Sequence, residues 1–338
     1  YKNTAGNFNI NQTANMANTN GTAYYYNEGS AMNINGTVNN SGTSNVVNKA
    51  GELNVGGTFS NTGNTTFTND GTNFNVNGTI ANSEGTLALV NNNGALNINK
   101  TGTVSNTSNT TITNNGEEGL NVFGTIDNGG TLDMTNHGDA GLNVSGKITS
   151  SGNLTMTNSG AKGVNIDSAA RVNGSNNISI DNNSNGGVNV KGIVKANNNI
   201  NVKSVNGNVV LGDNTDNNNY LDAGKDVNIT VNNGSILNYG VEKTLIKAGG
   251  NLNMDVTDGT IGTAVQQNGV EAGRTGIGPK DQGSRDFTKS INANVKGKVK
   301  ATTNKVNKPD DLVINYAAID SNMNIDHIKA DGRVILTV

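Results

Sequence analysis

The sequence contains no cysteine and no tryptophan, only two prolines, and few aromatic residues (4%). Without cysteine, neither disulfides nor thiolate metal sites can form. No apolar run reaches the about 18 residues typical of a membrane-spanning helix, so we expect no membrane insertion. Charged residues make up 14% of the chain, hydrophobic residues make up 33%, and the net charge is −3. A conventional globular core would be hard to fill, yet the chain does not resemble a charged, proline-rich disordered tail.

What the sequence does have is asparagine, which visibly outnumbers every other residue type, together with 45 glycines. Asparagine recurs at the centre of an apolar–Asn–apolar triplet, at intervals of 21 to 24 residues. The triplets begin at Phe8, Met32, Leu53, Phe74, Leu96, Leu120, Leu142, Val164 and Val188. Each triplet is followed by Gly-Thr-apolar, then by an alternating segment such as LTMTN (154–158), then by a glycine-rich corner. Each unit therefore predicts three short strands separated by turns.

Three strands and three corners in about 22 residues are typical of one coil of a parallel β-helix. The sequence thus predicts an all-β solenoid and no long helix, because a 3.6-residue periodicity is nowhere sustained. Few apolar residues belong to each unit, so a single coil cannot offset the entropy cost of ordering its backbone and requires neighbouring coils. The residues expected to point inward in stacked columns include Leu120, Val122, Leu142, Val144, Ile148, Leu154, Met156, Val164 and Ile166.

Asparagine occupies two kinds of position in this scheme. Asn69, Asn114, Asn136 and Asn158 follow the third strand, where asparagine suits a bend because it tolerates left-handed angles and bonds its own turn. The central residues of the triplets would point outward and form a column, in which side-chain amides can bond from coil to coil. The predicted ladder includes Asn97, Asn121, Asn143 and Asn165. The alternative is that asparagine is merely a tolerated surface residue.

The repeat changes toward the C-terminal side. After Gly207 the period loosens, and DVNITV (226–231) and NLNMDV (251–256) indicate further triplet strands. Both prolines lie between residues 262 and 310, where the pattern breaks. We therefore expect β-helix coils over 1–261, an excursion with a basic strand over 262–310, and a resumed β-helix over 311–338. The chain starts without Met or a signal peptide and stops inside RVILTV, which leads us to expect a piece of a longer polypeptide.

The coils resemble those of filamentous-haemagglutinin-type adhesins, the large exoproteins of two-partner secretion in Gram-negative bacteria. Three segments are more narrowly similar to the leukotoxin-family filamentous adhesins of anaerobic bacteria: GGNLNMDVTDGTIG (249–262), GIGPKDQGSRDFTKSINANVKG (276–297) and NMNIDHIKADGRVILTV (322–338). The resemblance implies a right-handed β-helical shaft at the bacterial surface, secreted through an outer-membrane transporter. It implies a host-cell or glycan receptor as partner, besides neighbouring coils of the same longer chain. The N-terminal secretion domain of that family has no counterpart in this sequence.

Candidate sites are few. The acidic cluster GDNTDNNNYLDAGKD (212–226) offers Asp213 and Asp216 as weak metal ligands, but the spacing fits no calcium motif, and a solvated corner explains it better. Tyr24, Tyr25 and Tyr26 could stack on sugar rings or staple a corner. His137 and His327 have no second histidine or cysteine nearby, which favours surface positions.

The segment INANVKGKVKA (291–301) alternates, and as one strand it would place Lys296, Lys298 and Lys300 about 7 Å apart on one outer face. Such lysines suit a sulfated or carboxylated glycan, although lysines also protect an exposed edge strand. Pairs such as Thr66/Thr68 and Thr111/Thr113 hint at an ice-binding face, but Ala88/Val90 interrupts it. Asn-x-Ser/Thr sequons, for example at Asn64 and Asn109, raise the alternative of glycosylation.

Together these observations predict a structural and adhesive shaft with no enzymatic activity, no cofactor and no nucleic-acid partner. The alternative from another class is a polysaccharide lyase or hydrolase, or a glycan-binding module, with its cleft at the 262–310 excursion. Such enzymes require clustered carboxylates.

Overall fold

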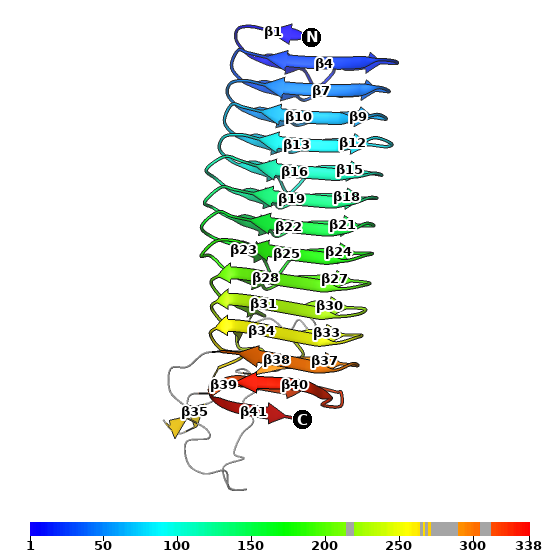
Figure 1. The fold of residues 1–338 in the computed structure, drawn as a ribbon. Coiled ribbons are helices and arrows are strands. Elements are labelled where there is room, and N and C mark those ends of the chain that lie inside the picture. The colour runs from blue at the N-terminus through cyan, green and yellow to red at the C-terminus, as the bar shows by residue number, and fades with distance from the viewer. Residues whose placement is uncertain (214–219, 264–265, 268–269, 272–289, 305–311) are drawn as a thin grey trace. The chain divides into compact units, whose positions relative to one another are not determined.

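The computed structural model describes residues 1–213, 220–263, 266–267, 270–271, 290–304 and 312–338. Every regular element within these ranges is a β-strand, and the strands of successive coils pair in parallel (Figure 1). This confirms the predicted all-β solenoid with three strands per coil. The described residues hold no helix of sufficient length and hydropathy to cross a membrane. The chain divides into two compact units, one formed by 1–165 and 169–176 and the other by 166–168 and 177–338.

The first unit contains three parallel sheets, and each coil contributes one strand to each of them. The first sheet is built from the apolar–Asn–apolar triplets: β2 (Phe8–Ile10), β5 (Met32–Ile34), β8 (Leu53–Val55), β11 (Phe74–Val76), β14 (Leu96–Ile98), β17 (Leu120–Val122) and β20 (Leu142–Val144). β23 (Val164–Ile166) lies where the two units divide. The second sheet begins most of its strands at the Gly-Thr motif: β3 (Asn15–Asn18), β6 (Thr37–Asn40), β9 (Thr58–Asn61), β12 (Thr79–Asn82), β15 (Thr103–Asn106), β18 (Thr125–Asn128), β21 (Lys147–Ser150) and β24 (Arg171–Gly174). The third sheet holds the alternating segments: β1 (Lys2–Asn3), β4 (Thr22–Asn27), β7 (Thr43–Asn48), β10 (Thr65–Asn69), β13 (Leu87–Asn91), β16 (Thr110–Asn114), β19 (Leu132–Asn136) and β22 (Leu154–Asn158).

The second unit repeats this arrangement with longer coils. Its first sheet contains β26 (Val188–Val190), β29 (Val209–Leu211) and β32 (Ile236–Asn238). Its second sheet contains β27 (Ile193–Ala196), β30 (Leu221–Ala223), β33 (Ile246–Ala248), β37 (Ile291–Val295), β39 (Leu312–Ala318) and β41 (Arg333–Thr337). Its third sheet contains β25 (Ile178–Asn182), β28 (Ile200–Asn206), β31 (Val227–Asn233), β34 (Leu252–Asp258), β38 (Val299–Thr303) and β40 (Ile325–Ala330). A short antiparallel pair, β35 (Gln266–Gln267) and β36 (Val270–Glu271), completes the set.

Two sequence predictions about this unit are corrected. DVNITV and NLNMDV form β31 and β34, which pair with β28 and with each other in the third sheet and not in the first. Their paired residues are 27 and 25 positions apart, so the longer corners predicted there are confirmed. Strands β37 and β38, predicted to belong to an excursion, pair with β33 and β34 and are part of the solenoid. Residues 272–289 and 305–311 lie outside the described ranges.

The strands of neighbouring coils pair in a register that places identical or similar residues beside one another. Strand β17 pairs with β20 so that Leu120 lies beside Leu142 and Val122 beside Val144. Every residue that the sequence analysis expected inside, including Val164 and Ile166, is at most 1% exposed. Because each strand alternates, the residue between two buried ones faces outward, and the apolar columns fill the interior.

Corner glycines allow this close stacking. Gly141 has a φ of 85°, in the left-handed region that glycine adopts readily, and it precedes the strand that begins at Leu142. A Cβ at Gly141 would lie 2.6 Å from the carbonyl oxygen of Gly163 in the next coil. Glycine at this corner therefore meets both a backbone and a packing requirement.

A ladder of asparagines runs through the interior, at the last position of the third-sheet strands. Each side-chain amide donates to the side-chain oxygen of its counterpart one coil later, at 2.7 to 3.1 Å. The members are Asn3, Asn27, Asn48, Asn69, Asn91, Asn114, Asn136 and Asn158. Amides also donate to carbonyl oxygens of their own corners, as Asn136 does to Gly138 at 2.7 Å. The ladder thus satisfies buried polar groups that the apolar columns cannot.

This interior ladder corrects the predicted role of Asn69, Asn114, Asn136 and Asn158. The predicted bonds within their own turns are present. The predicted left-handed backbone is not: among the described non-glycine residues, only Asp320 has a positive φ. These asparagines end strands and are fully buried, whereas the sequence analysis placed them at bends.

A second interior set ends the second-sheet strands and uses threonine as a relay. Asn61 donates to the hydroxyl of Thr65 at 2.8 Å, and that hydroxyl donates to Asn82 at 3.0 Å. Thr110 links Asn106 to Asn128 in the same way, at 3.0 and 2.7 Å. The hydroxyl both accepts and donates, so each relay carries the bonding from one coil to the next.

Candidate functional site: the outer faces of the coils

The outward asparagines of the first sheet form the predicted ladder. Each one after Asn9 donates its side-chain amide to the side-chain oxygen of the asparagine one coil earlier, at 2.8 to 3.0 Å. The members are Asn9, Asn33, Asn54, Asn75, Asn97, Asn121, Asn143 and Asn165. These bonds favour the predicted ladder over the alternative that asparagine is only a tolerated surface residue. Asn189 lies in register with Val210, so the amide column does not extend to β29.

The third sheet presents the tyrosine segment on its outer face. The rings of Tyr24 and Tyr26 point to the same side and stack with centroids 5.8 Å apart and planes within 13°. Tyr24 is 48% exposed. The ammonium group of Lys2 lies 5.4 Å from the centre of the Tyr26 ring and 3.5 Å from the carboxylate of Glu28. An exposed tyrosine stacked on a half-buried one beside a cation is chemically suited to stacking on a sugar ring.

Tyr25 cannot belong to such a site, because it is only 1% exposed. Its ring stacks on Tyr1 and packs edge-on against Phe59, at centroid distances of 5.2 and 5.9 Å. Its hydroxyl donates to the side-chain oxygen of Asn40 at 3.3 Å, and burial raises its pKa. The prediction that three consecutive tyrosines could bind glycan is therefore wrong for Tyr25, since strand alternation turns it into the core.

The lysine segment is not one strand. Strand β37 ends at Val295 and β38 begins at Val299, so Lys296 and Lys298 occupy the corner between them and Lys300 alone lies on a strand. All three side chains are exposed, and Ile291, Ala293, Val295 and Val299 are buried, as the alternation predicted. The even 7 Å spacing is wrong, because the three lysines do not share one strand. Lys298 forms an ion pair with Asp326 at 3.2 Å.

Gly297 marks the point where the strand breaks. A Cβ at this position would lie 2.5 Å from the side-chain oxygen of Asn251, which accepts a bond from the Lys298 N–H at 2.9 Å. The corner therefore requires glycine and is fixed by an asparagine of the preceding coil. Lys296, Gly297 and Lys298 form an exposed basic corner and not the predicted basic strand face.

The acidic cluster does not present a metal site in the described part of the chain. Asp213 is 8% exposed, and its carboxylate accepts a hydrogen bond from the hydroxyl of Tyr220 at 3.0 Å. Asp216 lies outside the described residues. Within the described ranges, no three His, Asp or Glu side chains group closely enough to hold a metal ion. His137 is exposed and its ring bonds to Ser159 at 2.7 Å, and His327 is exposed on β40.

The threonine rows predicted on the third sheet are aligned. Thr66, Ala88, Thr111, Asp133 and Thr155 follow one another in register, so the row is interrupted as the sequence indicated. The second sheet carries an uninterrupted threonine column that the sequence analysis missed. Its members are Thr37, Thr58, Thr79, Thr103 and Thr125. The recurring Gly-Thr motif was the available signal.

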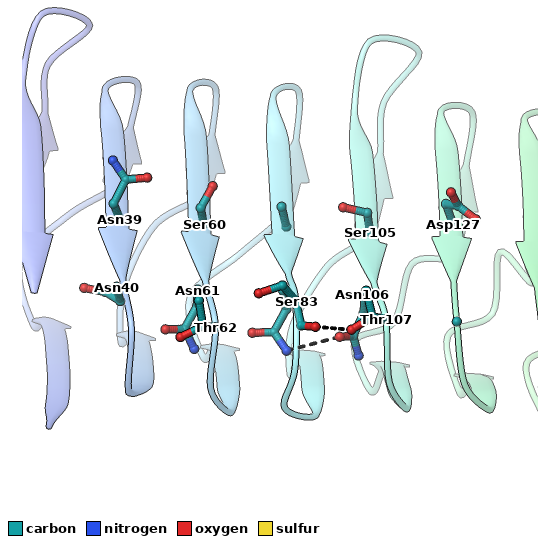
Figure 2. A pocket seen from close by; sticks show the side chains of 13 residues that line it. Asn39, Asn40, Ser60, Asn61, Thr62, Ser83, Ser105, Asn106, Thr107 and Asp127 are labelled. Atoms are coloured by element: carbon teal, nitrogen blue, oxygen red, sulfur yellow. Dashed lines mark hydrogen bonds between the residues drawn. The ribbon is translucent and has the colours of Figure 1, made fainter. Parts of the chain in front are cut away.

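A groove runs over the outer face of the second sheet, across β6, β9, β12, β15 and β18 (Figure 2). Its volume is about 610 Å³. The lining consists of Asn39, Asn40, Ser60, Asn61, Thr62, Ala81, Asn82, Ser83, Ser105, Asn106, Thr107, Asp127 and Gly129. Most of these residues carry a hydroxyl or an amide, one carries a carboxylate, and none is basic or aromatic. Small side chains in one column, with the amides at the strand ends, form the hollow.

Sequon asparagines fix corners through their oxygens. Asn64 accepts the backbone N–H of Thr86 at 2.9 Å, and Asn109 accepts that of Thr131 at 2.9 Å. Both asparagines are exposed. Glycosylation at these positions stays a hypothesis, and the bonds show a structural role for the same residues.

Comparison of the chain with protein-family models, with curated proteins and with solved structures found no match. The functional argument therefore depends on the chain's own residues and on the arrangement of its outer faces.

Proposed function

We propose that the chain is a structural shaft segment of a large secreted adhesin of the filamentous-haemagglutinin type, which attaches a Gram-negative bacterium to host cells or surface glycans. The observation that carries the proposal is the coil-to-coil bonding. Parallel strands, an interior amide ladder and an outer amide ladder all repeat with the coil. Repeated coils extend a protein in one direction, as an attachment shaft requires.

The outer faces of the coils are better suited to binding a ligand than to catalysing a reaction. Columns of hydroxyls and amides repeat from coil to coil, and a ligand that binds one coil weakly gains avidity by contacting several. Export through an outer-membrane transporter and a host-cell or glycan receptor belong to the same proposal. They follow from the resemblance of residues 248–338 to the leukotoxin-family filamentous adhesins.

The test is attachment of the 338-residue chain itself. Beads coated with the chain should bind epithelial cells saturably, and free chain should compete with them. An adhesin segment gives saturable, competed binding. Binding no higher than that of albumin-coated beads would contradict a receptor-binding role for this segment.

The basic corner offers a more specific test. Replacement of Lys296, Lys298 and Lys300 with glutamine should abolish salt-sensitive retention on heparin without changing the thermal melt, because exposed charges contribute little to stability. The matched control replaces Lys162, Lys195 and Lys225 with glutamine, because these lysines are also exposed and carry the same charge. Equal retention of the two triple variants would show that net charge and not the corner binds the glycan.

A further inference from the structure

We infer that the groove on the second sheet binds a linear, neutral polysaccharide, which lies along the stack and crosses β6, β9, β12, β15 and β18. The inference depends on the proposed adhesin function for its biological setting and names a ligand class for it. The site lies within the first unit and is separate in sequence from the basic corner at Lys296–Lys298.

The lining presents hydrogen-bonding groups that the protein leaves free. Among the described residues, the side chains of Asn39, Ser60 and Ser105 have no hydrogen-bond partner. They lie in one outward column, because β6, β9, β12 and β15 pair in register through Ser60 and Ala81. In Figure 2 these side chains stand on the strands along the groove. Free hydroxyls and amides bond to the hydroxyls of a sugar, which both donate and accept.

Asn61 adds an unmet hydrogen-bonding requirement. It lines the groove and is 3% exposed, and its side-chain oxygen has no donor in the described part of the chain. Its amide donates to Thr65 and to the carbonyl oxygen of Asn64, at 2.8 and 3.1 Å. That oxygen is itself buried, so its missing donor concerns the interior relay, and a ligand in the groove would meet the outward column instead.

The repeat of the groove fits a polymer. The same outward column meets a ligand at each strand, and strands lie about 4.8 Å apart, so the four steps from β6 to β18 amount to about 19 Å. An extended polymer would meet an outward side chain at each step, and the column offers Asn39, Ser60, Ser105 and Asp127 as polar contacts, with Ala81 at its centre. A small globular ligand would use only part of this length.

The residue types that line the groove favour some classes of polymer and disfavour others. The lining contains no lysine, arginine or histidine, which disfavours sulfated or phosphorylated chains. It contains no aromatic or large aliphatic side chain, which disfavours lipids and apolar peptides. Asp127 is the single carboxylate of the lining, and hydrolysis of a glycoside generally needs two, so the lining favours binding over cleavage.

A matched pair of substitutions tests the groove. Ala81→Arg places a long side chain on the groove floor, and Ala88→Arg places the same side chain outward on β13, on the next strand of the chain. Both alanines are half-buried and face outward, so both variants should fold. Affinity electrophoresis against soluble β-glucan, mannan, galactan and xylan, at low and at high salt, measures binding.

The wild-type chain and Ala88→Arg should bind at least one of these polymers equally well, with an affinity that does not fall at high salt. Ala81→Arg should bind it at least about tenfold more weakly. Failure of the wild type to bind any neutral polymer, or equal binding by both variants, would overturn the groove assignment. Cell attachment that persists in Ala81→Arg after loss of polysaccharide binding would leave the adhesin function intact. Polysaccharide binding by a chain that attaches to no cell would support the groove and contradict the adhesin.

Discussion

Asn121 donates its side-chain amide to the side-chain oxygen of Asn97, one coil earlier, at 2.8 Å. The interior ladder has the opposite direction, since Asn114 donates to Asn136, one coil later, at 3.1 Å. The two ladders therefore carry amide dipoles that point in opposite directions along the stack. Each residue between the ends of either ladder donates and accepts, so a change at one such position affects two bonds.

Replacement of Asn121 with aspartate should destabilise the chain by about 1 kcal/mol at neutral pH, because a carboxylate cannot donate to Asn97. Replacement with threonine should lower the free energy of unfolding by a smaller amount. Urea unfolding measures the difference, and Asn173→Asp on β24 is the control because Asn173 faces outward in register with Thr149 and no partner bonds its side chain in the described structure. Equal stability of wild type, Asn121→Asp and Asn121→Thr would remove the outer ladder as a stabilising feature.

A second prediction concerns the break in the threonine relay. Ser44 occupies the relay position of its coil and accepts a bond from Asn40 at 2.9 Å, but no donor reaches the Asn61 side-chain oxygen in the described structure. Ser44→Thr should complete the relay, because the β-branched side chain holds its hydroxyl in one rotamer, as at Thr65. We expect a gain of about 1 kcal/mol in unfolding free energy. Ser44→Ala should lose stability, and a Ser44→Thr variant less stable than wild type would contradict the relay explanation.

The pH dependence of stability should have opposite signs at two aspartates. Hydrogen bonds from Lys49 and Asn92 lower the pKa of Asp70. Its stabilising contribution is therefore complete above the unfolded-state pKa of about 3.9 and is lost as the pH falls through the lower folded-state pKa. Asp70→Asn should be slightly less stable than wild type at neutral pH, by under about 1 kcal/mol because the pair is exposed, and equal to it in strong acid.

Asp181 should behave in the opposite way. Burial raises its pKa, so the ionised carboxylate costs stability at neutral pH and the protonated form does not at low pH. Asp181→Asn should therefore raise the melting temperature at neutral pH and leave it unchanged in acid. Thermal melts of both variants across the acid range check the two signs, and a destabilised Asp181→Asn at neutral pH would contradict the desolvation argument.

The fold was predictable because its signals are local. The triplet period and the strand alternation identify inward residues such as Leu142 and Val144 from the sequence alone. The assignment of β31 and β34 failed because apolar–Asn–apolar also occurs in third-sheet strands, where Asn228 donates to Asn201. The longer alternation of β31 and β34, each seven residues, matches the third-sheet strands and not the three-residue triplets, and it was the signal that the sequence analysis missed.

The candidate sites were less predictable, because they depend on groups about 22 residues apart. From the local sequence, an asparagine at the end of a strand is predicted to be a turn residue. Its buried role depends on a hydrogen-bond partner in the next coil, as Asn136 is for Asn114. The groove needs small side chains in one column, as at Ser60, Ala81 and Ser105. Because these residues belong to successive coils, a short sequence motif does not identify the column. The lysine segment was mistaken for one strand because the contact between Gly297 and Asn251 is not visible in the local pattern.

The most direct test of the account is the stability of Asn114→Leu. Asn114 is fully buried, accepts a bond from Asn91 at 2.9 Å and donates to Asn136 and to the carbonyl oxygen of Glu118. If the interior ladder holds the coils together, leucine leaves these partners unpaired and should cost about 3 kcal/mol or more in urea unfolding. The control Ile112→Leu, on the same strand, should cost less than about 1.5 kcal/mol. If apolar burial alone held the coils, Asn114→Leu would be as stable as wild type or more stable, and that result would contradict the account.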